Sequence, residues 1–205
     1  MKKIINLTVL GVLLFFSQVC LGQAPKQVAG FFLGGNFSEF KEKVRMETVL
    51  PIRYREYLKE VETKPIEGFK SGLIWFGTCN EPNRIVRIKL KYADSSKKFY
   101  NKLLERFKQR YGEPDEWRGD PFHVVIAWKW SFIDSDRNPI SMILQHNTLD
   151  GEEKKGNALK MTLTDLIHQE HLCHEKKYPQ EGQVQKQRRK RQRGKGQNWD
   201  LLVPR

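Results

Sequence analysis

The sequence lacks the short motifs that mark the most common enzyme sites. It has no G-x-S-x-G nucleophile elbow, no H-E-x-x-H zinc-peptidase motif and no C-x-x-C-H haem-attachment motif. The Gly34-Gly35 pair is not followed by the lysine and serine of a phosphate-binding loop. Asp134 and Asp136 have the D-x-D spacing that opens a calcium loop, but the required glycine and distal glutamate are missing. None of these motifs therefore argues for an enzyme.

Cysteine is scarce, with three residues in a chain of 205. Cys20 lies in the N-terminal leader, and the bulky Val19 before it argues against a lipoprotein site. Removal of the leader leaves Cys79 and Cys173, an even pair that can form a disulfide in an oxidising compartment. The alternative is two unrelated small apolar residues, and the sequence leaves both interpretations open.

Residues 1–22 have the three parts of a secretory signal peptide. Lys2 and Lys3 supply the positive charge, an apolar stretch runs over residues 4–16, and Cys20 and Gly22 are the small residues before a cut after Gly22. The apolar stretch is shorter than the roughly 20 residues that a membrane-spanning helix needs. We therefore expect a cleaved leader, no transmembrane span in the mature chain, and a periplasmic or secreted protein.

Positive charge is concentrated at the C-terminal end. The whole chain has a net charge of +13, and residues 176–205 contribute +8 of it through ten basic and two acidic residues. Residues 181–205 have no apolar periodicity and are rich in Lys, Arg, Gln and Gly. A segment of this composition cannot bury enough apolar surface to fold alone. We therefore expect a single α+β domain at residues 23–180, followed by a basic disordered tail at residues 181–205.

The basic tail predicts an anionic partner. Its densest cluster consists of Arg188, Arg189, Lys190, Arg191 and Arg193. In a chain that kept its leader this cluster would indicate nucleic-acid binding, whereas an exported chain meets anionic lipid head groups, lipopolysaccharide or acidic polymers. The last four residues, LVPR, also match half of a thrombin site, and the sequence does not decide whether they are native.

Helical spacing of apolar residues predicts two main helices. Phe99, Leu103 and Phe107 form one stripe of a helix that begins at Asp94 or Ser95 and stops at Gly112. The second main helix runs from 164 to about 177, and a shorter helix is expected at 36–44.

Alternating apolar residues predict about five strands, at 71–79, 84–92, 122–134, 139–147 and 158–163. In the segment 84–92, the basic residues share one face and the apolar residues share the other; the basic residues are Arg87, Lys89 and Lys91. We therefore expect one face of the sheet to be basic and exposed to solvent. This pattern favours an antiparallel sheet with helices packed on one face. The order of helix, linker and hairpin occurs twice, which suggests two αββ repeats at residues 36–92 and 94–147.

Three histidines near the C-terminal helix are the sharpest chemical candidate. His168, His171 and His174 are spaced three residues apart, beside Cys173, and ligands of this kind suit zinc or copper. The alternative is a solvated last helix with Cys173 packed against the sheet.

Aromatic residues give one candidate contact surface. Trp128, Trp130 and Phe132 alternate along a strand and are expected in the core. Trp117, beside Arg118 in a segment predicted as a loop, is instead expected on a binding surface.

Together these features predict an exported, non-enzymatic binding protein of unidentified ligand. Its partner is expected to be an anionic envelope component or another envelope protein, reached in part through the basic tail. The alternative is a metal-dependent envelope enzyme, with zinc at His168, His171 and His174.

Overall fold

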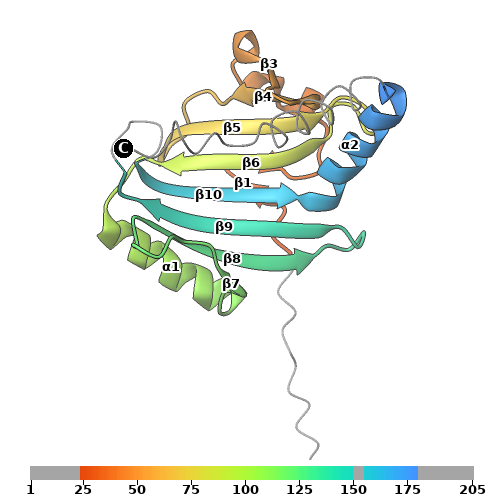
Figure 1. The fold of residues 1–205 in the computed structure, drawn as a ribbon. Coiled ribbons are helices and arrows are strands. Elements are labelled where there is room, and N and C mark those ends of the chain that lie inside the picture. The colour runs from red at the N-terminus through yellow and green to blue at the C-terminus, as the bar shows by residue number, and fades with distance from the viewer. Residues whose placement is uncertain (1–23, 150–154, 180–205) are drawn as a thin grey trace, which may run out of the picture.

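Eight strands form one antiparallel sheet, which dominates the computed structural model of the chain (Figure 1). The structure describes residues 24–149 and 155–179. The strand order across the sheet is β3-β4-β5-β6-β10-β9-β8-β7. The strands are β3 (Leu50–Ile52), β4 (Arg55–Glu62), β5 (Phe69–Gly77), β6 (Ile85–Tyr92), β7 (Glu116–Trp117), β8 (Val125–Ile133), β9 (Pro139–Asn147) and β10 (Gly156–Leu163).

The remaining elements are short or helical. Strands β1 (Gln27–Val28) and β2 (Phe31–Phe32) form a separate two-stranded ribbon. Two 3₁₀ helices, η1 (Phe37–Lys43) and η2 (Met46–Thr48), precede the sheet. The α-helices are α1 (Lys97–Tyr111) and α2 (Thr164–Lys177). The predicted α+β class and the antiparallel sheet are therefore confirmed.

The prediction of about five strands was wrong, because three strands of the main sheet have weak sequence signals. Strand β3 contains Pro51, which an edge strand tolerates because its N–H side faces solvent. Strand β4 buries Tyr57 and Leu58 in succession, so its apolar pattern does not alternate. Strand β7 has only two residues, too few for any period to be visible.

The strand order consists of two four-stranded meanders that meet in the middle of the sheet. Strands β3 to β6 form one meander and β7 to β10 the other, and the last strands of both, β6 and β10, pair antiparallel. A helical segment precedes each meander. The second meander extends to Leu163, so it is longer than the predicted αββ unit that ends at residue 147.

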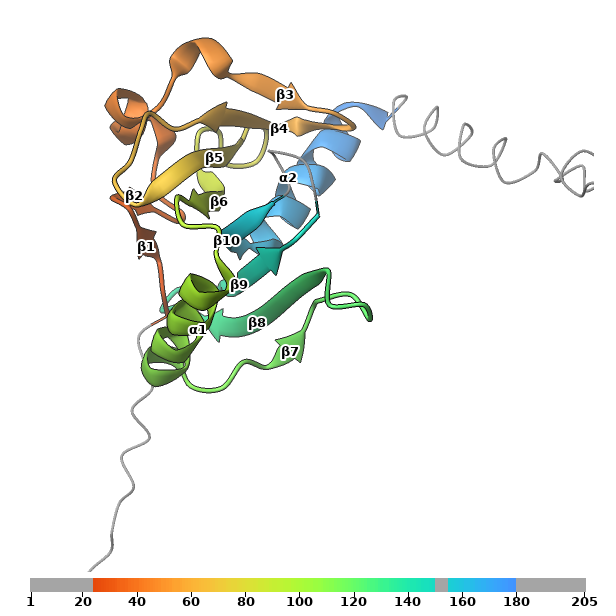
Figure 2. The ribbon, with the colours of Figure 1, turned by 90° about the vertical axis from the view of Figure 1, so that its left-hand side faces the viewer.

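The core lies on one face of this sheet. On β6, Ile88 and Leu90 are buried, whereas Lys89 between them is exposed on the opposite face. Helix α1 covers the core face through Tyr100 and Phe107, and Figure 2 shows the β1–β2 ribbon on the same side of the sheet. The ring of Tyr100 lies 5.5 Å from that of His146, between ring centroids, and is fully buried.

Local hydrogen bonds fix the two ends of α1. The Ser96 hydroxyl caps the helix by accepting a hydrogen bond from the N–H of Phe99, one residue after the expected cap. Gly112 ends the helix at a φ of 81°, a left-handed conformation that favours glycine, as predicted. The Gly112 carbonyl then accepts a 2.9 Å hydrogen bond from the indole of buried Trp130, which anchors the helix end to β8.

Helix α2 lies across the end of the sheet where β5, β8 and β10 finish (Figure 1). A disulfide joins Cys173 of this helix to Cys79, in the loop that follows β5, with 5.9 Å between the Cα atoms. The disulfide that the sequence left open is therefore present. Glu170 lies one turn earlier on α2 and is 1 % exposed, and its carboxylate accepts hydrogen bonds from three N–H groups of the same loop.

Candidate anion-binding site on the basic face

The face of the sheet opposite α1 brings three cations together on its two central strands. Lys160 of β10 is the direct register partner of Lys89 of β6. Side chains in this position have Cβ atoms about 4.5–5.5 Å apart, and like charges there destabilise a sheet. Arg87 projects from the same face, about 7 Å from Lys89 along the strand. We call the face that carries these three residues the basic face.

Arg87 is held in place by neutral and aromatic contacts, and no carboxylate of the described residues pairs with it. Its Nε donates a 3.0 Å hydrogen bond to the Thr162 hydroxyl, and its guanidinium lies over the Trp75 ring, 3.9 Å from the centroid. The Trp75 indole in turn donates to the Glu60 carboxylate at 2.9 Å. Within residues 24–149 and 155–179, neither Arg87, Lys89 nor Lys160 forms an ion pair with an acidic residue.

The local environment disfavours the positive charges of Arg87 and Lys160. Burial, together with the smaller effect of the Arg55 charge, lowers the pKa of the Arg87 guanidinium to about 10. Burial also lowers the pKa of Lys160, as do the charges of Arg87, Lys89 and Arg118. A bound anion would relieve the repulsion among these groups. The cluster therefore has the electrostatic character of an anion-binding site.

A groove of about 780 Å³ begins beside Lys89 and runs over strands β4, β5 and β6. Its lining is more basic than acidic, with Leu73 and Ala158 among its apolar members, and its charged residues are Arg45, Lys64, Lys70, Lys89 and Lys91 against Glu60 and Glu62. This volume lies within the range of roughly 300–1,000 Å³ that is typical of small-molecule sites. The basic face therefore offers both a charged centre and a concave surface next to it.

The structure separates the two neighbouring residues that the sequence placed on one binding surface. Trp117 lies in β7 rather than in a loop, and its ring packs at 4.8 Å against Trp128 in an edge-on arrangement. Gly119 allows this packing, since a Cβ there would lie 2.2 Å from the Trp117 ring. Arg118 is close enough to the basic face for its charge to lower the pKa of Lys160. Of the two, Arg118 is the one associated with the cation cluster.

The described side chains near the three histidines do not form the set of ligands that a metal site needs. His171 and His174 lie with ring centroids 5.1 and 5.9 Å from that of Tyr57, and His168 is exposed. Cys173 is in the disulfide and cannot act as a thiolate ligand. Among residues 24–149 and 155–179, no group of three or more His, Cys, Asp or Glu side chains is arranged to hold a metal ion. The zinc site remains a prediction without a geometric counterpart there.

Some predicted elements lie outside the described residues. These are the leader at 1–22 and the basic cluster of Arg188, Arg189, Lys190, Arg191 and Arg193. Sequence reasoning identified the cations of β6 but missed Lys160, whose pairing with Lys89 follows only from the order of the strands. Its one local signal is a lysine at an outward position of the alternating segment Ala158–Leu163.

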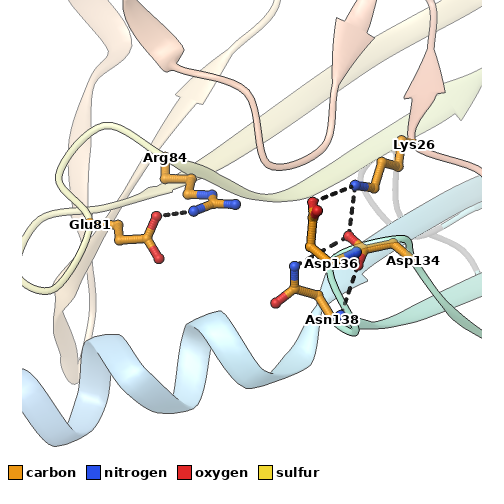
Figure 3. A network of polar contacts seen from close by, with 6 residues as sticks. All are labelled: Lys26, Glu81, Arg84, Asp134, Asp136 and Asn138. Carbon is orange, nitrogen blue, oxygen red and sulfur yellow. Dashed lines mark hydrogen bonds and ion pairs between the residues drawn. The ribbon is translucent and has the colours of Figure 1, made fainter.

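The D-x-D segment binds a cation from the chain itself. The Asp134 carboxylate accepts hydrogen bonds from the N–H groups of Asp136 and Asn138, both at 2.8 Å, and forms a 2.7 Å ion pair with Lys26 (Figure 3). Burial by itself would raise the pKa of Asp134, but the Lys26 and Asn138 hydrogen bonds outweigh it and lower the pKa to about 2. This contact fixes the N-terminal segment to the β8–β9 hairpin.

Asp134 is therefore expected to make stability depend on acid pH. Because its pKa is lower in the folded protein, its contribution is complete above about pH 4 and is lost as the pH falls towards 2. The loss should be roughly 1 to 2 kcal/mol, since solvent contact of Lys26 screens the pair. Urea unfolding of the Asp134→Asn protein should show a weaker dependence between pH 4 and 2. The control is Asp165→Asn, an exposed carboxylate of α2 that is not paired with Lys26, and equal pH profiles for the two variants would contradict this role.

Comparison of the chain with protein-family models, with curated proteins and with solved structures gives no match. Neither α1 nor α2, nor any shorter helix in the described part of the chain, has the length and apolarity needed to cross a membrane. We therefore infer function from the geometry of the basic face.

Proposed function

We propose that this protein is a non-enzymatic binding protein of an extracytoplasmic compartment, and that Lys89 and Lys160 bind an anionic group of its ligand. The observation that carries the proposal is the direct opposition of these two lysines in the sheet. A sheet gains nothing from such a pair in the absence of a counter-charge, because opposite like charges repel. Binding of an anion turns that repulsion into two charge-assisted contacts.

Two further features support the compartment. Residues 1–22 have the pattern of a secretory signal, and the disulfide between Cys79 and Cys173 is of a kind that persists in oxidising compartments. An exported protein meets phosphorylated and carboxylated molecules at membrane and wall surfaces, which provide the anionic group that the lysines require.

The basic tail contributes a second, less specific attraction in this proposal. Residues 176–205 carry a net charge of +8, which favours accumulation at anionic envelope surfaces and weakens with salt. The sheet lysines then select the ligand, while the tail increases its local concentration. The alternative of a metal-dependent enzyme gains no support from the geometry of the histidines in the described residues.

The test is a calorimetric titration of the mature protein, residues 23–205, with tripolyphosphate as the probe. The Lys89→Gln, Lys160→Gln double variant should bind at least tenfold more weakly, because hydrogen bonds to charged groups contribute about 1.5–3 kcal/mol each. The same variant should unfold at an equal or higher temperature, since the repulsion between the lysines is removed.

The matched control is the Lys98→Gln, Lys102→Gln variant, which removes the same charge from exposed positions of α1. It should retain most of the affinity for tripolyphosphate. Equal losses in the two double variants would show that binding reflects only overall charge and would refute the proposed site.

A further inference from the structure

We infer that the ligand of the basic face is a linear acidic polysaccharide. One of its negative groups lies between Lys89 and Lys160, and the chain continues along the groove towards the end of β4. The inference rests on the function proposed above and specifies the chemical class of the ligand. It follows from the series of cations in the groove and from the hydrogen-bonding groups between them.

Cations continue from the central lysine pair into the groove. Lys91 lines it one outward position beyond Lys89 on β6, about 7 Å along the strand. Lys64, two residues after the end of β4, and Lys70 of β5 also line it, and both are exposed. Strands β10 and β4 are three strand spacings apart, about 14 Å, so one phosphate or carboxylate group at Lys160 cannot also contact Lys64. A ligand that meets all these lysines needs several negative groups in one chain.

Positive charge exceeds negative charge along the groove. Its lining contains five basic and two acidic residues. Glu62 is ion-paired with Arg45, which leaves Glu60 as the second carboxylate among four lysines. A polyanion therefore gains more attraction than repulsion along the groove.

Hydrogen-bonding groups in the lining favour a sugar polymer over a polymer that offers charge alone. The Glu60 carboxylate accepts one hydrogen bond from the Trp75 indole at 2.9 Å, and a carboxylate can accept several. Ser71 and Gln145 lie in the same row of the sheet as Lys91, and each side chain has both donor and acceptor capacity. Sugar hydroxyls can donate to the carboxylate and bond to these side chains, whereas an ionised polyphosphate chain offers acceptors only. The lining therefore matches a chain that carries both negative groups and hydroxyls.

The same lining does not favour a single-stranded nucleic acid. Proteins that bind such strands stack the bases on aromatic side chains. Among the described residues that line the groove, Phe69 is the one aromatic, and its ring stacks on Tyr92 at 4.9 Å between centroids. Tyr92 in turn contacts Phe99 of α1, so these rings belong to the core face of the sheet. The described lining therefore offers no aromatic surface to a base.

The test titrates the mature protein with galacturonic acid and with hexagalacturonic acid, and follows backbone amide signals by NMR. The signals of Ser71 and Lys89 report on the groove separately from the basic tail. The hexamer should bind there at least about tenfold more tightly than the monomer, because linked contacts act at a high effective concentration. The Lys64→Gln, Lys70→Gln variant should weaken hexamer binding about fivefold and change tripolyphosphate binding less than about twofold. The spectrum of each variant verifies its fold.

Glu60→Ala separates a sugar polymer from a polymer that offers charge alone. It should weaken hexagalacturonate binding about threefold or more, because sugar hydroxyls lose a charged acceptor. The same variant should strengthen the binding of linear polyphosphate, because a repelling carboxylate is removed. The charge-matched control for the lysine variant is Lys98→Gln, Lys102→Gln on α1, which should keep hexamer affinity at the groove within about twofold.

The outcomes distinguish this inference from the proposed function. Equal affinities of monomer and hexamer, with tripolyphosphate binding still lost in the Lys89→Gln, Lys160→Gln protein, would overturn the polymer and leave the anion site intact. Tighter groove binding of polyphosphate or oligothymidylate than of hexagalacturonate, at the same net charge, would assign the groove to another polyanion and also overturn the inference. Equal losses of hexamer binding in the groove variant and in its α1 control would do the same. Tripolyphosphate binding that is insensitive to Lys89 and Lys160 would overturn the proposed function itself.

Discussion

Unfolding of the Cys79→Ser, Cys173→Ser protein is expected to require about 4.5 kcal/mol less free energy than unfolding of the native protein. The disulfide closes a loop of 94 residues, and loop-closure entropy gives a stabilisation of this size for so long a loop. The loop contains β6 to β10, so the cross-link restricts more than half of the sheet in the unfolded chain.

Equilibrium unfolding in urea, followed by circular dichroism, measures this loss as a lower midpoint with the free energy extrapolated to water. Reductant provides the internal control, since it should lower the stability of the native protein to that of the variant and leave the variant unchanged. Intact mass with and without alkylation confirms the state of the thiols. A loss below 1 kcal/mol would mean that the bond restricts the unfolded chain much less than loop-closure entropy predicts, or that it strains the folded state.

The Glu170→Ala protein is expected to lose about 3 to 5 kcal/mol, the second large effect. The carboxylate accepts hydrogen bonds from the N–H groups of Thr78 at 3.0 Å, Cys79 at 2.7 Å and Glu81 at 2.6 Å. An alanine leaves these three donors without their partner, and each unsatisfied buried donor costs about 1–3 kcal/mol. It also leaves a void under Gly77, where a Cβ would lie 2.5 Å from the carboxylate.

Graded substitutions separate charge from shape at this position. Glu170→Gln keeps the size and one accepting oxygen but turns an NH₂ group towards the loop, so it should lose roughly half as much as Glu170→Ala. Gly77→Ala should destabilise the protein as well, because its new methyl group occupies the position of the carboxylate. Glu175→Gln, more exposed on the same helix, is the control and should change stability by under about 0.5 kcal/mol.

The two effects are expected to overlap, because the disulfide and Glu170 hold the same loop against the same helix. In a double-mutant cycle the combined loss should therefore be smaller than the sum of the single losses. Exact additivity would show that the carboxylate and the disulfide act independently, contrary to the shared loop seen in the structure.

Sequence reasoning succeeded where a local period was long and regular. The alternation of residues 84–92 identified β6 and its basic face, and the stripe of Phe99, Leu103 and Phe107 identified α1. It failed where partners override local pattern: β4 is irregular because Tyr57 and Leu58 are both buried, Tyr57 against the rings of α2. The sequence did not predict the edge strand β3, because a proline within a short run argues against a strand.

The candidate site shows the same division. The cations of β6 are visible from residue spacing, but Lys160 becomes part of the site only because β10 returns to pair with β6, about 70 residues later in the chain. The local sequence around Trp117 is typical of a contact residue. In the fold, however, its ring packs against Trp128, and Gly119 leaves the space that the ring occupies. Such pairings depend on topology, which no single stretch of sequence contains.

The position of the disulfide also determines how the molecule would respond to stretching. A force applied at the two termini passes through the bond between Cys79 and Cys173, so it can peel away β1 to β5 while the ring of chain between the cysteines bears no load. The 94 residues of that ring have an extended length of about 310–340 Å, which stretching can release only after the bond is reduced. Lys89 and Lys160 both lie inside the ring, so tension on the chain ends would not pull β6 and β10 apart directly.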